Sequence, residues 1–416
     1  MQSKNSNSFL GMQLPITSTG FFSNPNSLAP FGNLQQELGL HSRLFCDSIC
    51  NPQQLKRRVN LLVDVSHLHH SHVIGKGGRN VKSISEQTKC NIHFPDSNRA
   101  NIPEKSNQVF ISGPVPGINE AREIIRSMLP FYVSFQVAIA NDCFPSTTQF
   151  LRLVENRYSV EIFLSQLTSL GPNSNLHSVT VNVKALSFQL NSLEEATTVL
   201  LRQLFKEDFD KVRIRTCIEI DPRHQERMLA APRNIVREII LSTGCEIHFP
   251  ESKRDSNFYE CPTEKSTVIL SGTREGIFRA RKFVMDNLPV KMSFDITEDE
   301  FNCVQIMDPN DIRTKFGVAI SVKCHRKYEQ RRNVQVFTTE NNMLGLIGFY
   351  NSVIERTKIM YLNGDNKDSP SLSISRSLWN PGLMESSCCS MSSSNEDKEN
   401  CWITQNLFKC MDEKNE

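Results

Sequence analysis

The chain has 416 residues, of which 38% are hydrophobic and 22% charged, and its formal net charge is +2. This length suffices for two or three average domains, and the near-neutral charge excludes a polycation, so any nucleic-acid surface has to be local. The 13 cysteines have no regular spacing and no secretory signal is recognisable, which favours reduced thiols over a disulfide framework. No stretch approaches the roughly 18 apolar residues of a membrane span, so we expect no membrane association.

The positive charge of the chain is concentrated in one region. Residues 56–99 contain eight Lys or Arg against three acidic residues, together with five of the ten histidines. A local excess of this kind is where a surface for nucleic acid is expected.

The two ends of the chain have the composition of disordered segments. Residues 1–55 are rich in Asn, Ser, Gln, Pro and Gly, and residues 363–416 are rich in Ser, Asn and acidic residues. Such segments have no sustained apolar pattern with which to build a core. We therefore predict a disordered N-terminal segment, a disordered Ser-rich tail and a continuous structured block between them.

The structured block contains two copies of one unit. CNIHFPDSNR at 90–99 returns as CEIHFPESKR at 245–254, an offset of 155 residues, with seven of ten positions identical. EKSNQVFISG at 104–113 corresponds to EKSTVILSG at 264–272 in the second copy. MLPFYVSF at 128–135 likewise corresponds to NLPVKMSF at 287–294. Similarity of this length and order indicates an internal duplication.

The apolar periods of the first copy predict the order β-α-α-β-β-α. Alternating apolar residues over 59–65 indicate a strand with one buried face, and Ser66 is a candidate cap for a short helix. The apolar stripe that ends at Pro130 indicates the last helix. The elements between them are a helix ending at residue 74, a helix closing near residue 89, and strands at 90–94 and 109–111.

Each copy also has a second half that lacks a glycine cluster. Its pattern is strand, helix, strand, strand and helix, first over residues 131–208 and again over 290–362. We therefore expect four small modules in two pairs. Their predicted ranges are 56–130, 131–208, 209–289 and 290–362.

Gly75, Lys76, Gly77 and Gly78 join the first two predicted helices. Glycine adopts backbone angles that other residues resist, and its missing side chain allows another backbone to pass close by. Free amide groups and the positive end of the following helix favour an anion, and Lys76 adds a mobile positive charge. These features predict a site for a phosphate chain.

A G-x-x-G sequence between two short helices of a β-α-α-β-β-α module resembles the KH domain, whose loop clamps the backbone of four unpaired nucleotides. The resemblance implies an α+β fold of tandem type I KH and KH-like modules, each with a three-stranded antiparallel sheet packed on three helices. It also implies a groove beside the loop, in which phosphate contacts give affinity and base edges give preference. The candidate RNA-binding residues are Gly75, Lys76, Gly77, Gly78, Arg79 and Lys82, with Val73, Ile74, Val81, Ile84, Ile92 and Phe94 as the apolar groove.

The sequence DVSHLHHSHVIGKGGRNVKSI at 64–84, followed by CNIHFPDSNR and EKSNQVFISG, is similar to the Bicaudal-C family of KH proteins. The resemblance covers roughly residues 56–360. It implies a cytoplasmic regulator of mRNA translation and stability, often in germline or developing tissue, that binds single-stranded RNA in untranslated regions and recruits deadenylase or translational-repressor proteins. We expect neither a further KH module ahead of residue 56 nor a sterile alpha motif domain, so the family's self-assembly is not inferred.

The second copy keeps the frame of the loop but not its glycines. Under the repeat offset, residues 75–78 correspond to Ala230, Ala231, Pro232 and Arg233. Cβ atoms, and a proline without an amide hydrogen, would obstruct the close approach of a phosphate. We therefore predict that the first module clamps RNA and that the third has a structural or protein-binding role.

Other interpretations of these residues stay open. The glycines could form only a tight turn between helices. His67, His69, His70 and His72 could form a metal cluster, but no matching Cys or carboxylate set accompanies them, so we expect solvent-facing helix residues.

The sequence contains no Walker loop, nucleophile elbow, paired-Cys zinc site or kinase signature, so we expect no enzyme activity, cofactor or metal. The alternative function is a protein-protein adaptor scaffold, in which degenerate KH modules recruit deadenylation or polyadenylation factors.

Overall fold

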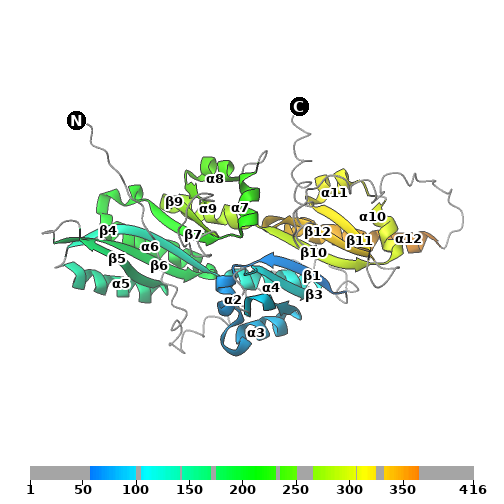
Figure 1. Cartoon of the computed structure of the whole chain (residues 1–416), viewed down its shortest axis with the longest axis horizontal. Helices are drawn as coiled ribbons and strands as arrows, with labels where there is room; N and C mark the ends of the chain where they lie inside the picture. Colours follow the sequence, from blue (N-terminus) through cyan, green and yellow to red (C-terminus); the bar gives the residue numbers. More distant parts are fainter. Residues whose placement is uncertain are drawn as a thin grey trace, which may run out of the picture.

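The computed structural model describes residues 57–99, 105–140, 143–169, 175–230, 235–250, 266–305, 307–324 and 332–364. These residues form an elongated molecule built on two six-stranded antiparallel sheets, with helices packed against them (Figure 1). The predicted disordered N-terminal segment lies outside the described residues, as does the predicted tail except for residues 363 and 364, which are helical. In the described part of the chain, no helix combines the length and the apolar character needed to cross a membrane.

The first module has the predicted order of elements. Ser66 caps its first helix, because the Ser66 Oγ accepts a hydrogen bond from the Leu68 amide at 3.3 Å. Alternate residues of its first strand, Val59, Leu61 and Val63, are buried, as the apolar period predicts. The elements are β1 (Val59–Asp64), α2 (His67–Ile74), α3 (Arg79–Thr88), β2 (Asn91–His93), β3 (Gln108–Gly113) and α4 (Val115–Met128).

The third module repeats this order, which confirms the duplication. Its close packing is repeated as well: Cys90 lies against Gly113, and Cys245 lies against Gly272, so that a Cβ at either glycine would meet the thiol. The elements are β7 (Ile214–Glu219), α7 (Pro222–Leu229), α8 (Ile235–Thr243), β8 (Glu246–His248), β9 (Thr267–Gly272) and α9 (Arg274–Asp286).

The second and fourth modules confirm the α+β fold and differ in their helices. The second module has two helices, and its elements are β4 (Pro130–Ala140), α5 (Phe144–Tyr158), β5 (Glu161–Ser169), β6 (Leu176–Leu186) and α6 (Leu190–Phe205). The fourth has three, one more than its pattern suggested, because Asp308 caps an additional helix by accepting a hydrogen bond from the Asn310 amide at 2.9 Å. Its elements are β10 (Pro289–Ile296), α10 (Glu298–Gln305), α11 (Pro309–Phe316), β11 (Ala319–Cys324), β12 (Arg332–Thr339) and α12 (Met343–Gly364).

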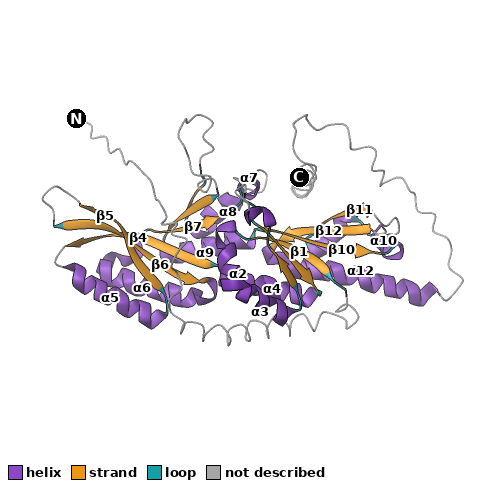
Figure 2. Ribbon diagram, turned by 60° about the horizontal axis from the view of Figure 1, so that its bottom comes forward, coloured by secondary structure: helices purple, strands orange, loops and turns teal. Residues whose placement is uncertain are grey.

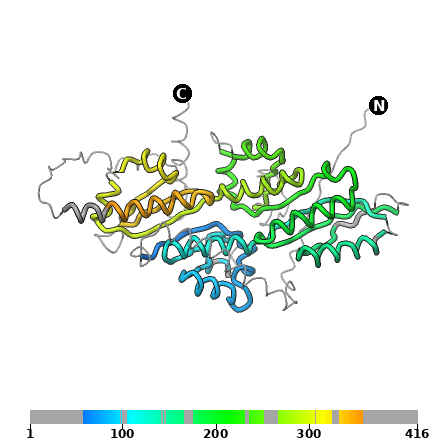
Figure 3. Tube along the Cα trace, turned by 180° about the vertical axis from the view of Figure 1, so that it is seen from behind, coloured from blue at the N-terminus to red at the C-terminus, as the bar shows by residue number. Residues whose placement is uncertain are grey.

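The sheets join modules in an order that the duplication does not suggest. One sheet has the order β11-β12-β10-β1-β3-β2, so the first module is continuous with the fourth (Figure 2). The other has the order β5-β6-β4-β7-β9-β8, so the second module is continuous with the third. The trace in Figure 3 accordingly shows the first module, in blue and cyan, beside the fourth, in yellow and orange.

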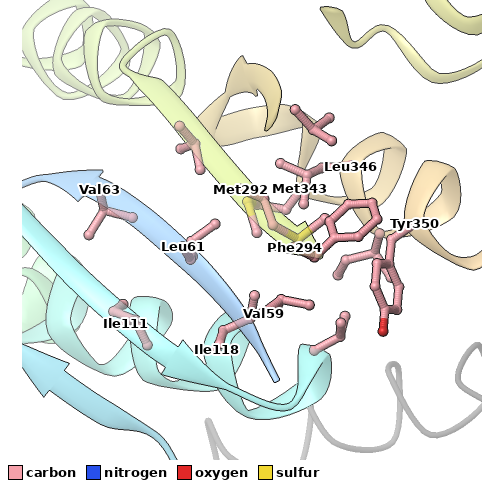
Figure 4. Packing of buried hydrophobic residues seen from close by; sticks show 14 of the residues in the cluster. Val59, Leu61, Val63, Ile111, Ile118, Met292, Phe294, Met343, Leu346 and Tyr350 are labelled. Atoms are coloured by element: carbon pink, nitrogen blue, oxygen red, sulfur yellow. The ribbon is translucent and has the colours of Figure 1, made fainter. Parts of the chain in front are cut away.

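A single hydrophobic core spans the first and fourth modules (Figure 4). β1 pairs with β10 so that Leu61 lies opposite Met292, and both side chains are fully buried. Phe294 of β10 meets Tyr350 of α12 edge to face, with ring centroids 4.9 Å apart. Burial of one such side chain is worth about 1.5–3 kcal/mol, so the shared core makes the two modules one cooperative unit. A second core spans the second and third modules.

Replacing Leu61 with Ala should lower the free energy of unfolding by about 2–5 kcal/mol, because it leaves a cavity in the shared core. The loss should appear in both modules at once. Hydrogen exchange measured at increasing denaturant concentration would show the loss of protection in peptides from β1 and from β12. Leu153→Ala, at a leucine that is 63% exposed, is the matched control and should change stability by less than about 0.5 kcal/mol. Protection that persists in β12 while β1 opens would contradict the shared core.

Candidate nucleic-acid interface

The loop between α2 and α3 has three glycines in the left-handed region. Gly75, Gly77 and Gly78 have φ angles of 73°, 62° and 75°. The Gly75 amide donates to the Ser71 carbonyl at 3.0 Å and so ends α2, and the Gly78 amide donates to the Gly75 carbonyl at 3.0 Å. The single turn between them is the helix η3 (Lys76–Gly78). This backbone favours glycine at three positions, because side chains strain the left-handed conformation.

The three glycines differ in what surrounds them. A Cβ at Gly75 would lie 2.6 Å from the side chain of Asn80, which donates from its Nδ2 to the His72 carbonyl at 3.1 Å. A Cβ at Gly77 would meet nothing within 4 Å, and one at Gly78 would meet only Val81, at 3.8 Å. Gly75 is therefore needed to close the loop, whereas Gly77 and Gly78 leave open space at the surface.

Positive charge lies beside this open backbone. Lys76, Arg79 and Lys82 are all exposed, and within the described ranges none of them forms an ion pair. Arg79 is also the first residue of α3, at the positive end of the helix dipole. Three cations and this helix end thus lie at one edge of the module, which suits a chain of phosphates.

The predicted groove residues lie in two layers. Val73 and Ile84 were expected to line the groove, but both are fully buried in the core. They lie beneath the surface because the apolar faces of α2 and α3 have to cover the sheet, and they can support the residues above them without contacting a ligand. The predicted groove residues that are only partly buried are Ile74, Val81, Ile92 and Phe94.

His70 is a structural residue and does not face solvent as we expected. Its side chain is buried, with Nε2 2.8 Å from the Val65 carbonyl oxygen and Nδ1 3.2 Å from the Asn98 Nδ2. Its ring also meets Phe94 edge to face, with centroids 5.0 Å apart. His70 therefore joins the end of β1 to the segment after β2, and so holds Phe94 in place. No periodic pattern indicated this role or that of Asn80.

The other histidines of α2 also have defined surroundings. His67 Nδ1 lies 3.1 Å from the Asn107 Oδ1, and His72 Nε2 lies 3.0 Å from the Met128 carbonyl oxygen. Burial lowers the pKa of His70 and of His72. Burial, with the neighbouring His72 and Arg281, lowers the pKa of His69 to about 4. Among the described residues, no group of three His, Cys, Asp or Glu side chains is placed to hold a metal ion.

The third module differs at the corresponding loop. Ala230, which corresponds to Gly75, has an extended backbone with φ −67° and ψ 133°. Ala231, Pro232 and Arg233 lie outside the described residues. The backbone at the start of this loop therefore takes a different course from that of the first module.

A β-α-α-β-β-α module with this glycine loop defines a KH-domain protein, and the KH domain family model matches residues 60–127 and 216–286. The chain is 36% identical to protein bicaudal C homolog 1 of Mus musculus over 292 residues, which cover 70% of this chain. It is 31% identical to protein bicaudal C of Drosophila melanogaster over 269 residues, which cover 64% of this chain. The chain belongs to the Bicaudal-C family of KH-domain proteins.

The similarity covers only part of these relatives, since the chain spans 28% of the length of the mouse protein and 28% of the Drosophila protein. A solved structure titled "KH domains" is 17% identical with a TM-score of 0.48, and the match covers 74% of this chain and 83% of that one.

The stability of the chain should fall as the pH drops below 6.5, the ordinary pKa of histidine. His69 has a pKa of about 4 in the folded state, so between these values the unfolded state binds the extra proton. Its contribution is therefore complete above pH 6.5 and is lost progressively as the pH falls through 4. In His69→Gln, which takes up no proton, the melting temperature should decline less steeply over this window. Equal slopes for the two proteins would contradict the prediction.

Proposed function

We propose that the chain binds single-stranded RNA through the glycine loop of its first module. The observation that carries the proposal is the open, left-handed backbone of Gly77 and Gly78, on which a Cβ would meet almost nothing within the protein. The space that these glycines leave is available to the backbone of a ligand. A phosphodiester there would be attracted by the positive charges of Lys76, Arg79 and Lys82, all of which are exposed.

The apolar residues beside the loop support a ligand with unpaired bases. Ile74, Val81, Ile92 and Phe94 are partly buried, so each keeps some surface against which a base can pack. A duplex keeps its bases stacked inside, whereas a single strand can offer their faces and edges. In this arrangement the phosphates supply most of the affinity, and the groove supplies the preference among bases.

The wider role that we propose is the regulation of mRNA translation and stability in the cytoplasm, through untranslated regions of mRNA and with deadenylase or translational-repressor proteins as partners. Membership of the Bicaudal-C family supports it. The division of the chain supports it too, because one module carries the glycine loop and the others leave surface for protein partners. The role is one of binding, since the loop is surrounded by lysine and arginine and offers no general base.

A protein-protein adaptor is the second candidate, and the surface of the third module favours it. Leu229, Ile240 and Leu241 are 47%, 42% and 76% exposed at the end of α7 and along α8. Under the repeat offset the last two stand where the first module has Ser85 and Glu86. Apolar residues in place of polar ones suit a protein partner, such as a deadenylation or polyadenylation factor.

The loop is tested by a double variant that reverses its charge, Lys76→Asp with Gly77→Asp. Crosslinking of the full chain to a single-stranded RNA should fall at least about tenfold, because two carboxylates would repel the phosphates. The matched control places the same charges in the corresponding loop of the third module, Ala231→Asp with Pro232→Asp, and should crosslink like the natural chain. Thermal unfolding of each variant checks that it is folded.

Unchanged crosslinking in the first-module variant would defeat the proposed clamp. Absence of crosslinking in the natural chain would favour the adaptor instead. A salt titration gives an independent check, since binding led by phosphates has to weaken steeply as the salt concentration rises.

A further inference from the structure

A cavity of about 270 Å³ lies where all four modules meet. The first module contributes Arg122 and Arg126 from α4, and the third contributes Arg281 and Asp286 from α9. The second and fourth modules each contribute the first residue of a short helix, Ser187 in η6 (Ser187–Gln189) and Glu340 in η9 (Glu340–Asn342). Three guanidinium groups therefore share one small space with two carboxylates.

One carboxylate is already used by two of the arginines. The Glu340 Oε2 accepts from Arg122 Nη1, and the Glu340 Oε1 from Arg126 Nη2, both at 2.6 Å. All three side chains are largely buried, with 6–15% of their surface exposed. Burial alone would raise the pKa of Glu340, but the charges of Arg126 and Arg122 bring it below its usual value. Glu340 is thus ionised, and Arg122 pairs in addition with Glu123, since the Arg122 Nη2 lies 3.3 Å from the Glu123 Oε1.

The third arginine, Arg281, pairs with no carboxylate among the described residues. The Arg281 guanidinium lies over the ring of Phe131, 4.1 Å from the centroid, and within the described ranges it makes no hydrogen bond and no ion pair. Asp286 lines the same cavity but accepts from Lys282 at 2.6 Å. Stacking covers one face of a guanidinium and leaves the N–H donors at its edge unused. Burial, with the charge of Arg126, lowers the pKa of Arg281 to about 10.

The duplication relates Arg281 of the third module to Arg122 of the first. Gly117 and Pro130 in the first copy correspond to Gly276 and Pro289 in the second, and the same alignment pairs Arg122 with Arg281. This correspondence places the two arginines at the same position of α4 and α9.

Ser187 and Glu340 also correspond to each other. The Ser187 amide donates to the Leu129 carbonyl at 2.8 Å, and the Glu340 amide donates to the Leu288 carbonyl at 2.9 Å. Arg122 has a glutamate from the fourth module, whereas the position that corresponds to this glutamate, in the second module, is an uncharged serine. Arg281 therefore lacks a second carboxylate that would correspond to Glu340, the partner of Arg122.

We propose that the cavity binds a phosphate-class oxyanion between Arg281 and Arg126, where the second carboxylate is missing. A phosphoryl group offers several oxygens to forked guanidinium donors and carries the charge that the site lacks. A cavity of about 270 Å³ has room for a phosphoryl group. The group belongs either to an RNA backbone or to a small phosphorylated molecule. The inference does not depend on the glycine loop.

Thermal unfolding of the full chain in inorganic phosphate tests the proposal. The ionic strength is kept constant with chloride, and the melting temperature of the natural chain should rise with phosphate and saturate, because only the folded state binds. Arg281→Met keeps an apolar stem over Phe131 but removes the donors, and should weaken phosphate binding at least about tenfold. Arg279→Met, at an exposed arginine of the same helix, is the matched control and should respond like the natural chain.

A variant that adds a negative charge to the cavity keeps the proposal testable even if Arg281→Met fails to fold. Ser187→Glu places a carboxylate where the fourth module has Glu340, so it should raise the melting temperature in phosphate-free buffer and abolish the response to phosphate. An equal response in the natural chain and in Arg281→Met would overturn the proposal. So would an Arg281→Met variant that melts lower by the same amount with and without phosphate, since that would make Arg281 only a stacking residue.

Two further arms identify the source of the phosphate. If the site holds an RNA backbone, a uridine oligonucleotide should crosslink less to Arg281→Met than to Arg279→Met, also in the charge-reversed glycine-loop variant. If it holds a small molecule, glycerol phosphate should reproduce the shift seen with inorganic phosphate while the oligonucleotide gives equal crosslinking. Either result supports an oxyanion site, and the absence of any shift with all three probes overturns it.

Discussion

The antiparallel pairing of β1 with β10 is the constraint on which the rest of the structure depends. β1 is the first described strand, and β10 comes after three complete modules, so a large part of the chain has to be closed into a loop before the pair forms. The entropic cost of such closure grows slowly with loop length, and it is offset by the buried faces that the pair brings together. With Leu61 opposite Met292, the strands of the first and fourth modules become one six-stranded sheet, and the helices on it share one core.

This closure also determines how the two halves of the molecule meet. The second and third modules form the other half, in which β4 and β7 pair at Ser134 and Arg215. The halves contact each other through polar groups, among them His224 Nε2 of the third module and Asp64 Oδ2 of the first, which lie 3.0 Å apart.

The glycines of the loop have two different explanations. Gly75 is explained by the fold, because the Asn80 side chain fills the space that a Cβ would need. Gly77 and Gly78 adopt left-handed angles, and among the described residues a Cβ at either would meet at most Val81, at 3.8 Å. The third module forms both of its helices with Ala230 in an extended conformation, so a βααββα module does not itself require this turn. What remains to be explained is the openness of two glycines beside Lys76, and a ligand explains it.

The elements were predictable from the sequence because their patterns report burial directly. Alternation in β1 and the apolar stripe of α4 follow from one face meeting a core. The pairing of β1 with β10 was not predictable, because the hydrogen-bonding edge of a strand leaves no mark on its side chains. The depth of Val73 and Ile84 was missed for a related reason, since an apolar period shows that a residue is covered and not what covers it. The burial of His70 depends on Asn98 and Phe94, which only the fold brings near.

The two copies differ at places where close packing does not fix the side chain. Both differences lie at sites where we propose that a phosphate binds. Cys90 and Cys245 stay against Gly113 and Gly272, because there is no room for a side chain there. At the loop and at the four-module cavity the copies diverge: the first module has three glycines beside exposed cations, and Glu340 has Ser187 as its counterpart in the second module. The hydrophobic cores lie within the pairs of modules, whereas the cavity is lined by all four. An oxyanion bound there would therefore act on the contact between the halves and leave the fold of each half unchanged.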